Sequence, residues 1–165
     1  LFLPRTGDLL ITDGDEVLYE RTSRDPKSWS FGALEPFDPG PQPYTPSGMI
    51  SLPQEIRRKA RFEGRNPFQA NGSAVYSVVK LVLGGYLGYI ARIKLWDLGA
   101  SIPILQRLGY SIVMRDGTEM DERVIEEFWH LDPVSPRRWK SQDLLFIAKD
   151  PETIQFMRES YKLPR

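Results

Sequence analysis

The sequence predicts an α/β fold, in which a layered mixed sheet carries helices on both faces and is preceded by a β-hairpin. A two-residue turn signal at Asp13-Gly14 predicts the hairpin, and beyond residue 51 short apolar segments alternate with helical patterns, as is typical of α/β layers. The chain of 165 residues is 41% hydrophobic, which is enough for one core. We therefore divide it into a hairpin at 1–21, a loop at 22–50 and an α/β domain at 51–165.

The hairpin is expected from residues 8–12 and 15–20, which flank the turn. An isolated hairpin is marginally stable in water, so its edges are expected to be exposed or paired with something outside this chain.

Residues 22–48 are rich in proline and glycine, which excludes a continuous helix or a central strand. Four aromatic residues favour packing of this loop on another surface: Trp29, Phe31, Phe37 and Tyr44. An ordered connection that covers the core and a lid or partner-binding flap are both consistent with this composition.

Two helices are expected next. One begins at Ser51 and ends at Arg61, where Arg57, Arg58 and Lys59 would stabilise its C-terminus, although a basic cluster could also bind phosphate. The other has Ser73 as N-cap and runs to about Leu83.

The segment Tyr89-Ile90-Ala91 is expected to form a buried strand, after which Arg92 and Lys94 could approach an anion or simply face water. A helix from Asp97 to Leu108 follows, kinked at Pro103. Asp97 at its start could cap the helix or hold a cation.

The remaining elements are read from shorter patterns. They are a strand at 110–114, a turn at Asp116-Gly117, a short helix at 121–130, a strand at 141–148 and a final helix capped by Asp150 with Pro151 in its first turn.

Charge and composition exclude several function classes. The 22 basic and 22 acidic side chains cancel, which argues against a nucleic-acid or anionic-membrane partner. No cysteine is present, so disulfides and zinc-thiolate sites are excluded. The apolar stretch 75–93 is interrupted by charges and glycines, so we expect no membrane span and a cytoplasmic location. The single histidine, His130, lacks metal-ligand spacing and is not expected to be catalytic.

Four short motifs occur in order between residues 72 and 110: Gly72-Ser73-Ala74, Leu83-Gly84-Gly85, Trp96-Asp97 and Leu108-Gly109-Tyr110. This stretch resembles the C-terminal half of the inositol monophosphatase family, of the fructose-1,6-bisphosphatase-like superfamily, whose signature has a G-S-A helix start, an A-G-R turn and a W-D-x-A-A helix. The family consists of magnesium-dependent, lithium-sensitive phosphatases of small phosphorylated molecules.

The resemblance implies a role for each matching position. Asp97 would be a metal ligand for Mg²⁺, while Gly72, Ser73 and Ala74 would face the substrate, a small phosphorylated metabolite. The hairpin would belong to the sheet of a missing N-terminal domain. That missing half, or a partner chain, would supply the rest of the site, and a homodimer is one arrangement left open.

Two departures from the family pattern limit what this chain can do alone. The D-P-x-D-G-T motif is absent, since Asp38-Pro39 and Asp132-Pro133 read as turns. Ile90 stands where inositol-specific members carry a Glu. A single carboxylate cannot run a metal-dependent hydrolysis, so this chain alone is expected to be inactive.

Two hypotheses follow. In the first, the chain is the C-terminal part of a Mg²⁺-dependent phosphatase that hydrolyses a small phosphomonoester once completed by the N-terminal half. In the alternative, it is a non-catalytic protein-interaction module that kept the fold without the full metal site.

Overall fold

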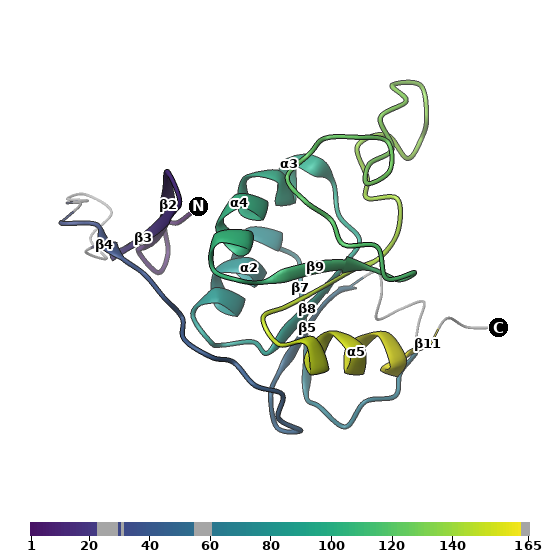
Figure 1. The fold of residues 1–165 in the computed structure, drawn as a ribbon, viewed down its shortest axis with the longest axis horizontal. Coiled ribbons are helices and arrows are strands. Elements are labelled where there is room, and N and C mark those ends of the chain that lie inside the picture. Colours follow the sequence, from purple (N-terminus) through teal and green to yellow (C-terminus); the bar gives the residue numbers. More distant parts are fainter. Residues whose placement is uncertain (23–29, 31, 55–60, 163–165) are drawn as a thin grey trace.

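A five-stranded mixed sheet forms the centre of the molecule (Figure 1). The structure, a computed structural model, describes residues 1–22, 30, 32–54 and 61–162. In spatial order the strands of this sheet are β7 (Phe68–Asn71), β5 (Ile50–Pro53), β8 (Gly88–Ala91), β10 (Leu145–Ala148) and β9 (Ser111–Met114). β7, β5 and β8 are parallel to one another, whereas β10 is antiparallel to both β8 and β9.

Helices cover both faces of this sheet, which confirms the predicted architecture. Among the described helices, α2 (Ala74–Val82), α3 (Leu95–Leu98) and α4 (Ile102–Arg107) lie on one face, and α5 (Pro151–Ser160) lies on the other (Figure 1). Alternate strand residues divide between the two layers, since Tyr89 and Ala91 join the cluster that contains α2, and Ile90 joins the cluster that contains α5. Both layers therefore share one central strand.

The predicted hairpin is present, with its turn one residue later than expected. β2 (Asp8–Asp13) pairs with β3 (Glu16–Arg21) in a register that sets Asp13 opposite Glu16. The turn residues are thus Gly14 and Asp15, and Gly14 has a φ of 56°, which glycine adopts without steric cost. Two short strands extend this sheet at its edges: β1 (Phe2–Leu3) and β4 (Glu35–Pro36).

The hairpin packs on the α/β layers through its apolar face. Leu10 is fully buried and Val17 nearly so, and both belong to the cluster that also contains α4. Arg107 Nε donates a hydrogen bond to the Gly14 carbonyl oxygen over 2.8 Å. These contacts join the two sheets through α4.

The start predicted for the helix at Ser51 is wrong, because Ile50–Pro53 is strand β5; Gln54 is helical, and residues 55–60 of the predicted helix lie outside the described residues. Ser51 is buried, and its hydroxyl donates to Ser77 Oγ over 3.1 Å. Parallel pairing with β7 and β8 overrides the local helical signal. The basic residues Arg57, Arg58 and Lys59 lie outside the described residues. Arg61–Phe62 forms β6, which pairs with β11 (Tyr161–Lys162).

The predicted helix from Asp97 to Leu108 is divided into three pieces: α3, a 3-10 turn at Gly99–Ser101, and α4. Lys94 is the N-cap residue of α3, so the prediction that Asp97 caps the helix is wrong; Asp97 lies inside its first turn. Pro103 occupies the first turn of α4 and starts that helix instead of kinking a longer one.

The segment 121–130 is also not a helix. It consists of turns ending in a β-bridge between Trp129 and Ser141. Asp121 Oδ1 accepts the backbone N–H of Arg123 over 2.9 Å, a local bond that competes with helix formation. Gln142 Nε2 donates to the Glu126 carbonyl over 2.8 Å. This bond holds the turn at 126–128 through a residue that lies outside the segment 121–130.

The described part of the proline-rich loop lies against both layers. Phe37 packs on Tyr19 with ring centroids 5.3 Å apart, and Tyr44 packs on Phe156 at 4.9 Å. Trp29 and Phe31, expected to pack in the same way, lie outside the described residues.

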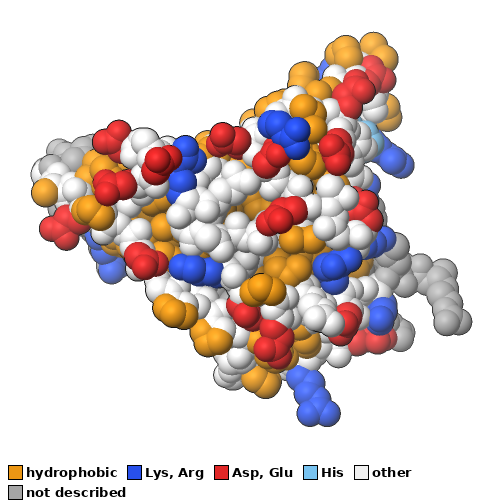
Figure 2. Space-filling view, viewed as in Figure 1, with side chains coloured by type: hydrophobic (Ala, Val, Ile, Leu, Met, Phe, Trp, Pro, Cys, Tyr) orange, Lys and Arg blue, Asp and Glu red, His pale blue; other side chains and the backbone are white. Residues whose placement is uncertain are grey.

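Charged side chains of both signs are interspersed over the face shown in Figure 2, in keeping with a net charge of zero. Within the described ranges, no helix has the length and apolar character needed to cross a membrane.

Candidate functional site

A pocket opens at the edge of the sheet where three parallel strands end. Pro53 closes β5, Asn71 closes β7, and Arg92 directly follows β8. All three residues line the same cavity, which has a volume of about 420 Å³. Ligands of α/β folds collect at the carboxyl ends of parallel strands, because the loops that follow the strands converge there.

The N-terminus of α2 forms one side of this pocket. Ser73 is its N-cap, as predicted, and Ser73 Oγ accepts the backbone N–H of Tyr76 over 3.3 Å. The first turn of α2 contains no acidic residue. Residues 72–75 line the pocket, so the positive end of the helix dipole borders the cavity and favours an anion there.

Gly72 leaves open space where a side chain would lie. A Cβ added at Gly72 would meet no heavy atom within 4 Å, and its φ lies outside the positive range that strains other residues. The fold of the described chain therefore does not require glycine here. A group bound in the pocket can approach the Gly72 backbone closely.

Asp97 lines the same pocket from α3. The structure thus brings together all four residues predicted from the sequence: Gly72, Ser73, Ala74 and Asp97. Tyr89, which also lines the pocket, is only 4% exposed. Burial, with a further contribution from the negative charge of Asp97, raises the pKa of the Tyr89 hydroxyl, which therefore stays protonated near neutral pH.

Among the described residues, three cationic residues and one acidic residue line the pocket, and the side chain of Arg92 is directed to the α5 face of the sheet, where its charge acts on Tyr161. Arg92, Lys94 and Lys140 all contribute to its lining. Within the described part of the chain, none of them forms an ion pair. Lys94 Nζ lies 4.6 Å from the centroid of the Trp96 ring, a cation–π contact at the protein surface. The balance of charge in the pocket is positive, which suits an anionic ligand.

Lys140 reaches the pocket because its loop is fastened to the segment after β8. Lys94 and Lys140 form an antiparallel bridge, Leu95 N–H donates to the Trp139 carbonyl over 2.7 Å, and Ser141 N–H donates to the Ile93 carbonyl over 2.8 Å. Trp139 has a φ of 66° and is the one non-glycine residue in the described ranges with a positive φ. Strain of this kind persists where surrounding contacts over-determine the backbone, which is common at functional sites.

Sequence reasoning found the start of α2 and Asp97 but missed Tyr89 and Lys140. Arg92 and Lys94 were expected either to approach an anion or to face water; both line the pocket, but Arg92 is exposed and its charge acts on Tyr161 on the α5 face. Tyr89 was assigned to a buried strand, and its position beside Asp97 depends on the path of α3. Lys140 belongs to a basic aromatic segment, residues 137–140, whose sequence predicts a surface loop, and only the closure of that loop brings Lys140 to the pocket.

Mg²⁺ prefers several oxygen ligands, among them one or two carboxylates. Among the described residues, no group of three histidine, cysteine, aspartate or glutamate side chains could hold a metal ion. Among the described residues that line the pocket, Asp97 is the one acid, and it shares the lining with the cationic residues Arg92, Lys94 and Lys140. The described residues of this chain therefore do not form a Mg²⁺ site by themselves.

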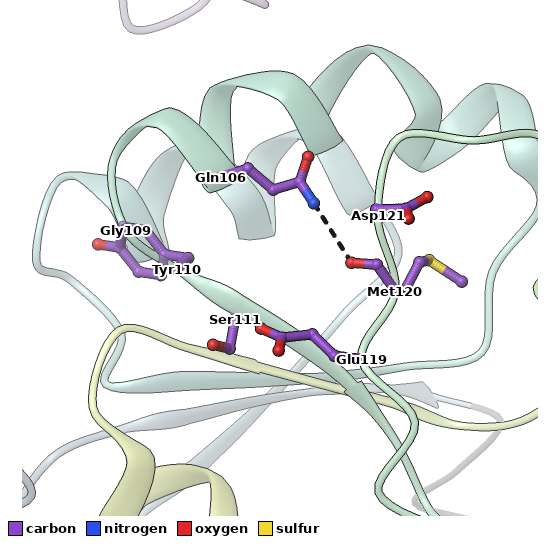
Figure 3. A pocket seen from close by; sticks show the side chains of 7 residues that line it. All are labelled: Gln106, Gly109, Tyr110, Ser111, Glu119, Met120 and Asp121. Carbon is purple, nitrogen blue, oxygen red and sulfur yellow. Dashed lines mark hydrogen bonds between the residues drawn. The ribbon is translucent and has the colours of Figure 1, made fainter.

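A second hollow, of about 490 Å³, lies beside α4 and β9 (Figure 3). Gln106 reaches from α4 and donates through Nε2 to the Met120 carbonyl over 3.3 Å. In the part of the chain that the structure describes, the charged residues that line this hollow are Glu119 and Asp121, and no cationic residue lines it. Its charge is thus opposite to that of the pocket at α2, and none of the residues predicted from the sequence lines it.

Comparison with known proteins identifies the fold. No protein-family model matches the chain, and no curated protein matches its sequence. Solved structures do match. The staphylococcal inositol monophosphatase IMPase-II is 13% identical with a TM-score of 0.56, over 89% of this chain and 52% of that chain.

Two further structures give the same result. An IMPase/NADP phosphatase complexed with Mg²⁺ and phosphate is 11% identical with a TM-score of 0.54, over 91% of this chain and 53% of that chain. Inositol monophosphatase-II from Staphylococcus aureus is 11% identical with a TM-score of 0.56, over 88% of this chain and 51% of that chain. This chain therefore shares the fold of inositol monophosphatase-family structures and spans about half their length.

Proposed function

We propose that this chain is the C-terminal part of a phosphatase resembling inositol monophosphatase, and that the pocket at α2 binds the phosphoryl group of a small phosphomonoester. One observation carries the proposal: Gly72, Ser73, Ala74 and Asp97, chosen from the sequence, line one cavity together with three cations. The fold likeness supports it, because one of the similar structures is titled as a complex with Mg²⁺ and phosphate. The hairpin at 1–21 would then join the sheet of the N-terminal half.

The residues of the pocket are suited to hold a phosphoryl group. A phosphomonoester carries nearly two negative charges at neutral pH, and the N-terminus of α2 offers backbone N–H groups to its oxygens. Lys94 and Lys140 add positive charge to the lining of the pocket. These groups would bind and orient the substrate.

Mg²⁺, when bound, would polarise the phosphoryl oxygen and activate a water molecule. In this proposal Asp97 is one ligand, and the remaining carboxylates come from the N-terminal half or from a partner chain, which includes a second copy. The positive charge of the pocket is consistent with that division, since the described chain contributes the binding groups and a single acid.

Phosphate release from glycerol 1-phosphate by the full-length protein, with and without Mg²⁺, tests the proposal. The expected result is Mg²⁺-dependent release, with kcat/KM reduced about 100-fold by Asp97→Asn, because a neutral amide binds Mg²⁺ more weakly than the carboxylate that it replaces. Glu127→Gln is the matched control, since Glu127 is exposed and does not line the pocket. Full activity of the Asp97→Asn protein, or no release in the presence of Mg²⁺, would overturn the proposal.

A further inference from the structure

The chain contains two asparagines, and the residues that follow them differ in their chemistry. Asn66 precedes Pro67, whose backbone nitrogen carries no hydrogen. Asn71 precedes Gly72, which has a backbone N–H group and no side chain. The side chain of an asparagine can react with the backbone nitrogen of the next residue only where that nitrogen can lose a proton. The covalent structure therefore blocks this reaction at Asn66 and permits it at Asn71.

The fold holds the two side chains in different surroundings. Asn66 is 3% exposed, and its Nδ2 donates to the carbonyl oxygens of Thr45 over 2.8 Å and of Gly48 over 2.7 Å. Asn71 is half-buried at the end of β7, and its Nδ2 donates to the Tyr86 hydroxyl over 2.7 Å. Asn66 is thus enclosed by the protein, whereas Asn71 remains accessible to water.

The backbone after Asn71 has room to rearrange. Gly72 is exposed and lies in a bend between β7 and α2. A Cβ added at Gly72 would meet no heavy atom within 4 Å, so no neighbouring group crowds this side of the backbone. Closure of a ring between the two residues would therefore change only the end of β7 and this bend.

From these observations we propose that Asn71 is a site of spontaneous deamidation and that the carboxylate formed there weakens anion binding in the pocket. The Gly72 nitrogen gives its proton to solvent and attacks Asn71 Cγ. The N–Cγ bond forms, the Cγ–Nδ2 bond breaks, and Nδ2 takes a proton from solvent and leaves as ammonia. Water then opens the succinimide at one carbonyl to give aspartate or at the other to give isoaspartate. The net reaction consumes one water and releases one ammonia.

The product places a negative charge at the anion-binding edge of the pocket. Asn71 lines this pocket directly before residues 72–75, which carry the positive end of α2. Either product replaces a neutral carboxamide with a carboxylate, which repels an anion bound at the helix end. Isoaspartate also adds one carbon atom to the main chain just before the cap residue Ser73. The effect on binding rests on the proposed function, whereas the deamidation itself does not.

Peptide mapping of the full-length protein, incubated at mildly alkaline pH and sampled over time, tests the reaction. Both asparagines lie between Arg65 and Lys80, so one tryptic peptide contains them and its fragment ions locate any change. We expect residue 71 to show the mass gain of an amide replaced by an acid, increasing with time and faster at higher pH. Residue 66 should show none, because Pro67 blocks ring closure.

The matched variant is Gly72→Ala, whose side chain the open space accommodates. It retains Asn71 but should lose the amide several-fold more slowly, because a side chain on the next residue hinders ring closure. The readout is the mass of the peptide and does not depend on activity. No mass gain at residue 71, or equal rates in the parent and in Gly72→Ala, would overturn the proposed modification.

Calorimetric titration with inorganic phosphate tests the consequence for binding. After full conversion, the parent should bind phosphate about tenfold more weakly than its fresh sample, the scale of one added like charge. Gly72→Ala, compared with its own fresh sample, should lose little over the same interval, which controls for general damage. Conversion at residue 71 with unchanged affinity would overturn the effect on binding. If the fresh parent binds no phosphate, the proposed function and this effect both fail, and the peptide mass alone decides the modification.

Discussion

The two long helices, α2 and α5, begin in opposite electrostatic surroundings. At α5 the carboxylate of Asp150 accepts three hydrogen bonds through Oδ2, from Thr153 N–H and Thr153 Oγ1 at 3.0 Å and from Tyr44 N–H at 3.1 Å, and Glu152 adds a second acid to the first turn. At α2 the cap is the neutral hydroxyl of Ser73, and the first turn contains no acid.

This difference distinguishes a helix start that the chain itself neutralises from one that is left positive and borders the pocket. The dipole of α5 is met by acids of the chain itself, and a loop residue, Tyr44, closes over its start. The N-terminus of α2 is capped without being neutralised and borders a cavity whose lining includes Lys94 and Lys140. Both helices thus have a capping side chain. The acidic cap of α5 also neutralises the helix dipole, whereas the neutral cap of α2 leaves the positive helix end open to an anion.

Placing the α5 type of cap on α2 is expected to have the largest effect. Ser73→Asp should preserve the free energy of unfolding, because Asp caps helices as well as Ser, but should weaken binding of glycerol 1-phosphate about 100-fold through charge repulsion. Calorimetric titration and urea unfolding measure the two effects. Ser73→Asn is the matched control, a neutral cap of similar shape that should retain binding. Equal affinities of the Asp and Asn variants would show that no anion binds at this helix end.

Removal of the α5 cap is expected to have an intermediate effect, on stability alone. Asp150→Ala should lower the free energy of unfolding by about 2 kcal/mol, the upper range for a cap, because the Tyr44 and Thr153 donors also lose their acceptor. Urea unfolding measures this loss. Affinity for glycerol 1-phosphate should not change, since Asp150 does not line the pocket. A stability equal to that of the parent would contradict this account of α5.

The smallest effect is expected at alkaline pH, from the buried tyrosine of the pocket. Burial first, and then Asp97, raises the pKa of Tyr89 above its usual value of 10.0. The stabilising contribution of the neutral hydroxyl is complete below the pKa of the unfolded chain and is lost as pH rises above it, because only the unfolded chain then ionises readily. Unfolding free energies measured between neutral pH and pH 11 should therefore fall less steeply for Tyr89→Phe than for the parent. Parallel pH curves would show that Tyr89 is not desolvated.

Local sequence signals predicted the elements whose ends are determined locally. Ser73 and Asp150 were identified as caps because a cap requires only its own side chain and the next turn of the helix, and both are confirmed. Asp13-Gly14 marked the hairpin, although the paired register shifts the turn by one residue. The alternation of elements was sufficient to predict the mixed sheet with helices on both faces.

The errors arose where distant residues decide the structure. Ser51 lies in a strand because β7 and β8 pair with it, and residues 121–130 form turns because Gln142 bonds to the Glu126 carbonyl. The same reason explains what was missed at the site. Asp97 and residues 72–74 belong to short motifs, whereas Lys140 reaches the pocket through backbone bonds to a segment far away in the sequence.

The strand order also has a consequence for how the chain acquires its structure. The central pairing of β8 with β10 sets Ala91 opposite Leu145, so the whole segment 92–144 must be closed into a loop before the middle of the sheet exists. Pairing over such a separation is slow, because the entropy of loop closure is lost before the strand contacts form. During synthesis the hydrophobic strand β8 leaves the ribosome well before its partner, and this interval is when the chain is most exposed to aggregation.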